Sequence, residues 1–435
     1  MFTTIANILK VSDLRNRIFF TLGILIIYRL GSFIPVPNVD VSVLGNFAKG
    51  NDVFGLLNTF SGGALSQFSI FAMGIMPYIT ASIIVQLLTM DVIPKFTEWA
   101  KEGENGRRKL AQFTRYGTIV LGLVQATGLA IGFNRMYGSQ LIMNSSFSTY
   151  AMIAIVLTAG TAFLMWLGEQ INEYGIGNGI SVIIFAGIVA GIPNGIGQIY
   201  ESLFVNAPSD AIFLRAIEAV LLVIGVIVLI AGVIFVQQGV RKIPVQYAKR
   251  VVGRKMYGGQ STHIPLKVNA AGVIPVIFAL SLLVFPPTIA SFFRSADGTG
   301  IANWIINNMN YTAPFGMVFY VILIIAFTFF YTFVQINPVQ MADNMKKNGG
   351  YIPGIRPGKT TSTYLTRVMT RITLTGALFL AVISILPMLI ASGLDLPSSV
   401  SIGGTSLLIV IGVGLDTMKQ VESQLIKRHY KGFIK

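Results

Sequence analysis

Long apolar stretches separated by short polar gaps fill this chain of 435 residues. A helix that crosses a bilayer needs about 20 mostly apolar residues, because the hydrocarbon core offers no partners for unpaired backbone groups. Ten stretches reach or approach this length, at residues 18–34, 68–90, 116–133, 151–167, 180–199, 216–237, 270–293, 315–334, 372–390 and 402–417. The pattern predicts an all-α polytopic membrane protein with ten transmembrane helices.

The second and seventh stretches share a local pattern, GIMPYI at residues 74–79 and GVIPVI at residues 272–277. The fifth and tenth are both short and both follow a glycine-rich entry, at 176–179 and 402–405. Each pair lies five spans apart, and because five is odd, the second half enters the membrane from the opposite side. We therefore expect two inverted five-helix halves, residues 1–200 and 201–435, with a functional site at their interface.

The basic residues predict the orientation of these spans. Of the 32 Lys and Arg residues, 27 fall in the N-terminal segment, the C-terminal tail and the gaps after the second, sixth and eighth spans. Cytoplasmic loops carry such an excess, so both termini are predicted to be cytoplasmic. Basic residues before the first apolar run imitate a signal peptide, but no small-residue cleavage site follows, which favours an uncleaved first span.

Composition changes this picture little and excludes several kinds of chemistry. The chain is 53% hydrophobic and 11% charged, and its net charge of +15 mostly reflects the asymmetry between the gaps. It has no cysteine and only two histidines, His263 and His429, which excludes disulfides and thiolate metal sites. Catalytic motifs such as His-Glu-x-x-His, Gly-x-Ser-x-Gly and the Walker A loop are missing. The sequence predicts no enzymatic activity and no cofactor.

Inverted repeats first suggest a secondary transporter of a small apolar or zwitterionic solute. Ion-coupled transporters usually place ionisable side chains deep in the membrane, whereas the centres of these spans contain none. The middle of spans two, five, seven and ten carries isoleucine instead. An apolar constriction blocks ions by dewetting, so a gated pore is the competing hypothesis.

One moderately apolar segment, residues 54–65, is too short to cross a bilayer and contains a pair of glycines. It fits a helix at the lipid interface and a re-entrant piece buried in the protein equally well.

These landmarks together resemble the SecY family, the channel subunits of the bacterial protein translocase. The matching motifs are YRLGSFIP at 28–35, FSGGAL at 60–65, GENGRR at 103–108, GIGNGIS at 175–181, the stretch 337–358 that ends in GIRPG, and GGTSLLI at 403–409. The resemblance implies a central pore through which unfolded polypeptides cross the cytoplasmic membrane of a bacterium, and from which transmembrane segments leave sideways into lipid.

The resemblance also implies roles for particular residues. A hydrophobic pore ring would consist of Ile75, Ile79, Ile180, Ile184, Ile277 and Ile409. The segment 54–67 would be a plug, with Phe60, Ser61, Gly62, Gly63, Ala64 and Leu65 at its centre. Spans two and three would face spans seven and eight across a lateral gate that includes Thr80, Ile84, Ala279 and Phe285.

The partners follow from the same resemblance. The two long basic cytoplasmic loops, 239–269 and 338–371, would dock the SecA ATPase and the ribosome through Arg241, Lys249, Arg250, Arg254 and Arg356. The small membrane subunits SecE and SecG, preproteins with signal sequences and the lipid bilayer complete the expected set. Without the resemblance, positive charge in these loops is explained by topology alone.

Overall fold

The computed structural model describes residues 11–42, 44, 58–90, 93–136, 141–144, 146–205, 212–247, 250–252, 255–257, 261–290, 293, 300–310, 313–393 and 398–431. Each of the ten apolar stretches overlaps one principal helix. These helices are α2 (Ser12–Gly31), α4 (Met76–Leu88), α6 (Glu104–Met136), α7 (Phe147–Tyr174), α8 (Gly179–Tyr200), α9 (Ile212–Gln238), α10 (Ile274–Ala290), α12 (Pro314–Gln335), α14 (Lys359–Gly393) and α15 (Ser398–Lys431).

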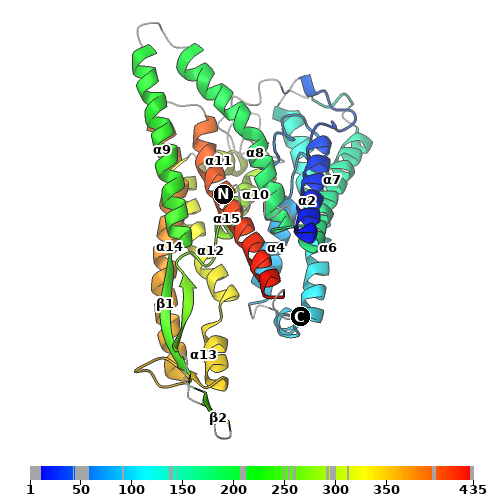
Figure 1. Ribbon diagram of the computed structural model, residues 1–435. Coiled ribbons are helices and arrows are strands. Elements are labelled where there is room, and N and C mark those ends of the chain that lie inside the picture. The colour runs from blue at the N-terminus through cyan, green and yellow to red at the C-terminus, as the bar shows by residue number, and fades with distance from the viewer. Residues whose placement is uncertain are drawn as a thin grey trace.

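Shorter elements connect them, namely α5 (Pro94–Lys101), the π-helical turn η2 (Glu201–Val205), α11 (Ile301–Asn308) and α13 (Pro338–Lys347). Within the described residues, six helices are long and apolar enough to cross a membrane, and α4 and α10 are shorter apolar helices. The fold is therefore that of a multi-pass membrane protein (Figure 1).

The shortness of α4 and α10 has the same backbone origin in both. Gly74 and Gly272 each adopt a left-handed conformation, with φ of 55° and 64°, two residues before the helix begins. Glycine tolerates positive φ because it has no Cβ. Pro77 and Pro275 then occupy the second helical position, where the missing N–H breaks no intrahelical bond. The repeated sequence pattern thus produces a repeated local structure.

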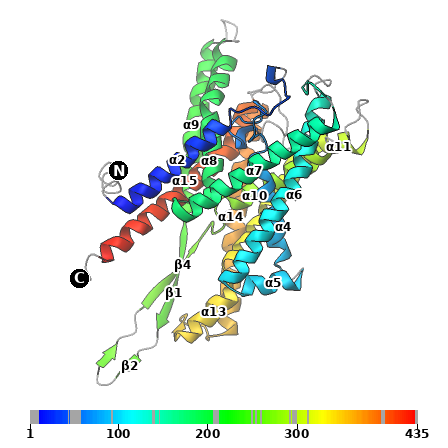
Figure 2. The same cartoon turned by 90° about the vertical axis from the view of Figure 1, so that its right-hand side faces the viewer.

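The all-α prediction is wrong in one region, because residues of the loop 239–269 form strands. Strand β1 (Val240–Tyr247) pairs antiparallel with β4 (Ser261–Lys267), and β5 (Gly350–Tyr351) joins its other edge. Two shorter strands, β2 (Arg250–Val252) and β3 (Lys255–Tyr257), pair with each other. Figures 1 and 2 show the β1–β4 hairpin extending beyond one end of the helices, beside α13.

The alternation of buried and exposed side chains explains strand β1. In β1, Ile243 and Val245 are buried whereas Arg241, Lys242 and Gln246 are exposed, which is the period of two that a strand with one covered face requires. The buried side chains form a separate small core with residues of β4, α13 and α14 and with Ile352, which follows β5. The other members are Leu266, Ala342, Met345, Leu365, Val368 and Met369.

The main core runs through the helices of both halves. Helix α8 packs on α15, while α10 packs on α4 and α6, so the first five principal helices contact the last five along two separate seams. Figure 2 shows α4, α6 and α10 side by side, as their contacts require.

Candidate functional site

Isoleucines of four helices lie in the main core. Ile75 caps the N-terminus of α4, Ile79 lies one turn later, and Ile184, Ile277 and Ile409 come from α8, α10 and α15. All five are at most 5% exposed and belong to one cluster. Ile180 is partly buried against the same cluster, at the start of α8. A Cβ built on Gly168 of α7 would lie 3.2 Å from Cγ1 of Ile180, so this side chain packs on α7.

The described part of the plug segment, residues 58–67, is a compact turn held by its own hydrogen bonds. The backbone N–H of Gly63 donates to the carbonyl of Asn58 over 2.8 Å, and that of Ser66 donates to Asn58 Oδ1 over 2.9 Å. The hydroxyl of Ser61 accepts from Leu65 N–H, and the hydroxyl of Ser66 donates to the carbonyl of Gly63. These bonds satisfy most of the polar groups that a non-helical segment would otherwise leave unpaired in the core.

The turn is buried in protein rather than laid on a surface. Phe60, Ser61, Ala64 and Leu65 are at most 7% exposed. Of the two interpretations that the sequence left open, burial inside the protein agrees with the re-entrant piece for residues 58–65, whereas residues 54–57 lie outside the described part. A small cavity shows what the turn faces, because its lining includes Phe60 and Ser61 together with Ile75, Ile79 and Ile184. The predicted plug and three predicted ring residues are therefore neighbours.

Two residues that the sequence analysis did not single out for the site hold the turn from the other side. Arg29, in the last turn of α2, donates from Nη1 to the carbonyl of Gly62 over 2.7 Å. Gly187 of α8 lies so close that a Cβ built on it would be 2.7 Å from the carbonyl oxygen of Phe60. The sequence contains a signal for Arg29, because this basic residue lies within the first apolar stretch, at the end away from the basic N-terminal segment.

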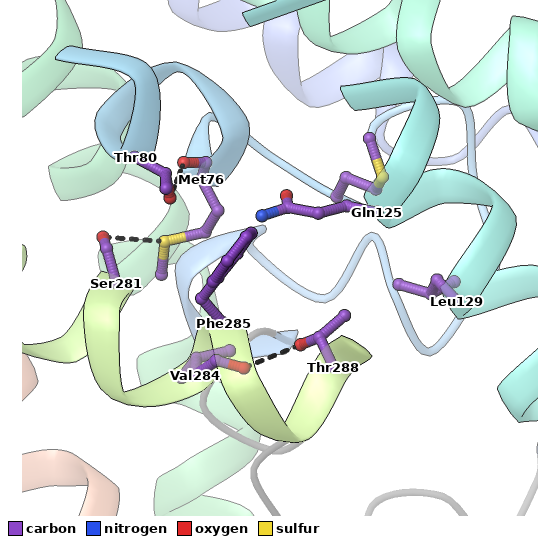
Figure 3. Close-up of a pocket in the computed structure, with 9 residues that line it drawn as sticks. Met76, Thr80, Gln125, Leu129, Ser281, Val284, Phe285 and Thr288 are labelled. Carbon is purple, nitrogen blue, oxygen red and sulfur yellow. Dashed lines mark hydrogen bonds between the residues drawn. The ribbon is translucent and has the colours of Figure 1, made fainter. Parts of the chain in front are cut away.

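Figure 3 shows the second candidate region, where α4 and α6 face α10. Thr80 and Phe285 line a cavity at this seam, whereas Ala279 is buried in α10 outside the cavity lining and Ile84 is 41% exposed. The cavity is also lined by Gln125 of α6 and by Ser281 and Thr288 of α10. Gln125 and Phe285 point toward each other across it in Figure 3. A line of polar side chains therefore interrupts an otherwise apolar contact.

One hydrogen bond crosses this seam directly, because the hydroxyl of Ser281 lies 3.4 Å from the sulfur of Met76. The single proton of this hydroxyl is shared with the carbonyl of Ile277 within α10, which lies closer, at 2.9 Å. Sulfur is also a weak acceptor, so the hydrogen bond from Ser281 to Met76 is weak. Sequence analysis gave no reason to select Gln125 or Met76.

The predicted docking residues lie on the sheet and the segment that follows β5. Arg241 is exposed on β1, and Arg356 is exposed between β5 and α14. Arg250 lies in β2, and Lys249 and Arg254 fall outside the described residues. Pairing of Gln246 with Tyr351 joins the two basic loops, and the Tyr351 hydroxyl donates to Gln246 Oε1 over 3.0 Å. We call the strands β1 to β5, α13 and the segment between β5 and α14 the platform.

Comparison with known proteins agrees with these features. A family model described as SecY matches residues 69–418. The chain is 63% identical over 435 residues to the protein translocase subunit SecY of Halalkalibacterium halodurans, covering 100% of both proteins.

Two solved structures share the fold at 18% identity, each covering 97% of this chain and 95% of the other. One, with a TM-score of 0.62, is a SecY protein whose plug domain is described as stabilising the closed state of the translocation channel. The other, with a TM-score of 0.60, is Sec61 in a canine ribosome-channel complex. Since the family model spans most of the chain and the identity extends over its full length, the chain belongs to the SecY family.

Proposed function

We propose that this protein is the channel subunit of a bacterial protein translocase, through which unfolded polypeptides cross the cell membrane and transmembrane segments enter it. The observation that carries this function is the buried turn at 58–67 packed against Ile75, Ile79 and Ile184, since it is a removable seal beside an apolar constriction. Full-length identity to a translocase subunit supports the same conclusion. The transporter alternative finds no support among the relatives.

The channel is formed by ten spans arranged as two inverted halves, residues 1–200 and 201–435, around a central pore. The left-handed glycines before α4 and α10 support this arrangement, because they sit at matching positions five spans apart. Both termini are cytoplasmic, a placement that rests on the distribution of basic residues. The platform lies on the same, cytoplasmic side, and its exposed Arg241, Lys242 and Arg356 support this placement.

The six ring isoleucines keep the resting pore impermeable to ions. Water leaves a narrow apolar constriction, and an ion cannot enter it without losing its hydration shell. The plug then lies against the ring and blocks the passage of polypeptide. Branched aliphatic side chains also suit a seal around a moving chain, because they contact it without specific hydrogen bonds that would bind one sequence.

Sideways exit takes place between α4 and α6 on one side and α10 and α12 on the other. The hydrogen bond from Ser281 to Met76 that spans the seam is weak, so its loss on separation costs little. An apolar segment that enters the opened seam exchanges protein contacts for lipid contacts, and a polar segment does not gain from this exchange.

The energy for transport comes from partners, since the chain provides no covalent chemistry. The platform docks the SecA ATPase and the ribosome through Arg241, Lys249, Arg250, Arg254 and Arg356, and basic side chains suit ribosomal RNA. A ribosome-bound complex of a protein with this fold supports the assignment. SecE and SecG pack on the lipid-facing surface, where α9 exposes apolar side chains such as Val220, Leu221 and Val228.

The ring can be tested by reconstituting the complex in planar bilayers. Ile79→Asn combined with Ile184→Asn should produce a resting ion current, because polar side chains allow the constriction to hydrate. Ile79→Val with Ile184→Val is the matched control, which keeps the ring apolar and costs about 0.5–1.5 kcal/mol per residue in packing. A folded Asn variant that conducts no more than the Val variant would contradict the ring.

A further inference from the structure

Arg29 stands apart from the other basic side chains of α2, because it reaches the plug. Its guanidinium is half-buried in the last turn of the helix and lies 4.5 Å from the centre of the Phe33 ring. Nη1 donates to the Gly62 carbonyl over 2.7 Å, across 33 residues of sequence. A bond from a charged donor at this distance belongs to the stronger class of protein hydrogen bonds.

The accepting carbonyl of Gly62 lies within the plug, so the hydrogen bond from Arg29 restrains the plug as a whole. Gly62 lies inside the turn that Asn58, Ser61 and Ser66 close by hydrogen bonds, so the turn moves as one unit if it moves at all. Gly62 also packs tightly, since a Cβ built on it would lie 3.0 Å from Gly187 Cα and 3.1 Å from the Tyr28 hydroxyl. A shift of the plug away from α8 would therefore stretch the bond to Arg29.

We propose that Arg29 is a positioning residue of the closed channel, whose hydrogen bond to the Gly62 carbonyl holds the plug in its seat and sets how easily the plug is displaced. This inference rests on the proposed channel function. We call the hydrogen bond from Arg29 to the Gly62 carbonyl the latch. The apolar contacts of Phe60 with Ile75 and Ile79 fill space, whereas the bond from Arg29 fixes the orientation of the turn.

Removing the latch should raise the population of displaced plug. Loss of a hydrogen bond to a charged group leaves the Gly62 carbonyl without its charged donor in a poorly hydrated site. We expect the displaced population to increase by at least about tenfold, which corresponds to about 1.4 kcal/mol.

Two structural roles of Arg29 need to be separated from the latch. Its charge favours the C-terminus of α2 through the helix dipole, and its guanidinium stacks on Phe33. Arg29→Lys keeps the charge at the helix end and loses the planar donor geometry. Phe33→Leu removes the aromatic ring and keeps Arg29. Arg17 supplies a matched control on the same helix, because its Nη1 donates to the carbonyl of Gly175 over 3.4 Å, far along the chain from the plug.

The readout is the accessibility of the plug itself. The chain has no native cysteine, so Ser61→Cys introduces a single thiol at a site that is 1% exposed. The labelling rate by a membrane-impermeant maleimide, applied to both faces of the reconstituted complex, measures how often the plug leaves its seat. Resting ion current is recorded for the same variants, and helix content and thermal melting confirm that each is folded.

In the Ser61→Cys background, Arg29→Gln should increase the labelling rate by at least about tenfold, and Arg29→Lys should give a smaller increase. Arg17→Gln and Phe33→Leu should change it by less than about twofold. Arg29→Lys carries the test if Arg29→Gln fails to fold. An unchanged rate in a folded Arg29 variant, or an equal increase from Arg17→Gln, would overturn the latch. If the ring variant Ile79→Asn with Ile184→Asn still conducts in that case, the channel function stands; if it is also silent, both proposals fall.

Discussion

The hydroxyl of Ser281 on α10 donates a hydrogen bond to the sulfur of Met76 on α4, over 3.4 Å and 205 residues of sequence. It joins the two halves of the chain at the seam where α4 and α6 meet α10 (Figure 3). This bond is weak, and the cavity beside it is lined by the polar side chains of Thr80 and Gln125 as well as by Phe285. Breaking the bond between Ser281 and Met76 therefore adds little to the cost of separating the seam.

Tying this seam together should stop export without unfolding the protein. Cysteine pairs that combine Met76 or a residue between Thr80 and Ile84 with a residue between Ala279 and Phe285 should include at least one that oxidises, given the usual Cβ separation of roughly 3.5–4.5 Å. Transport of a preprotein into vesicles should fall on oxidation and recover on reduction.

The control pair for this experiment lies within one half. A Cβ built on Gly122 of α6 would be 3.9 Å from the Cβ of Thr158 on α7, so Gly122→Cys with Thr158→Cys has suitable disulfide geometry. Oxidation of this pair should leave export intact. Full export by an efficiently oxidised pair across the seam would show that substrates do not need it to open.

Filling the space at Gly187 should disturb the plug. In Gly187→Ala the new methyl group would lie 2.7 Å from the Phe60 carbonyl and 2.9 Å from the Tyr28 hydroxyl, so the plug or α8 must move. We expect a loss of about 1–3 kcal/mol in stability from overpacking, and an increased resting ion current.

The matched control for Gly187 is one turn further along the same helix. Gly191 has open space where its Cβ would be, so Gly191→Ala should be neutral or slightly stabilising, in keeping with the helix propensity of alanine. The measurements are the melting temperature and the resting ion current of the Gly187→Ala and Gly191→Ala variants. Equal behaviour would mean that the plug does not press on Gly187.

Charge reversal at Arg356 should weaken the contact with a cytoplasmic motor. The side chain is exposed, and the hydrogen bond from the Thr361 hydroxyl goes to the Arg356 carbonyl, so Arg356→Glu leaves the local fold in place. We expect reduced motor-driven transport and reduced motor affinity. Lys359→Glu applies the same reversal three residues away and should have a smaller effect. Similar losses from both would indicate general electrostatics instead of a specific contact.

Labelling from the two sides of the membrane tests the orientation. Lys101 at the end of α5 and Lys359 at the start of α14 are exposed and should react from the cytoplasm when replaced by cysteine. Phe147 at the start of α7 is 91% exposed, and Phe147→Cys should react from outside. An impermeant maleimide applied to intact cells distinguishes the sides. Reaction of Lys101→Cys from outside would reverse the predicted topology.

The amino-acid sequence by itself determined where the helices lie. Partition between water and lipid depends on local composition, so each apolar stretch predicts its own helix without knowledge of its neighbours. The sequence also determined local backbone conformation, since the Gly-x-x-Pro pattern at Gly74 and Gly272 produced the same left-handed turn twice. The family motifs pointed to Ile75, Ile79, Ile184 and Phe60, which the structure places side by side.

Only the tertiary structure decided what those elements touch. Strand β1 escaped sequence analysis because its alternation is short and begins after two adjacent basic residues, and Ile243 and Val245 became core residues only when α13 and α14 covered them. The bond from Arg29 to Gly62 depends on the angle at which α2 meets the plug, and the one from Ser281 to Met76 on the approach of α4 and α10. Hydropathy and periodicity describe one segment at a time, whereas these contacts join segments whose relative position is fixed by the packing of all the others.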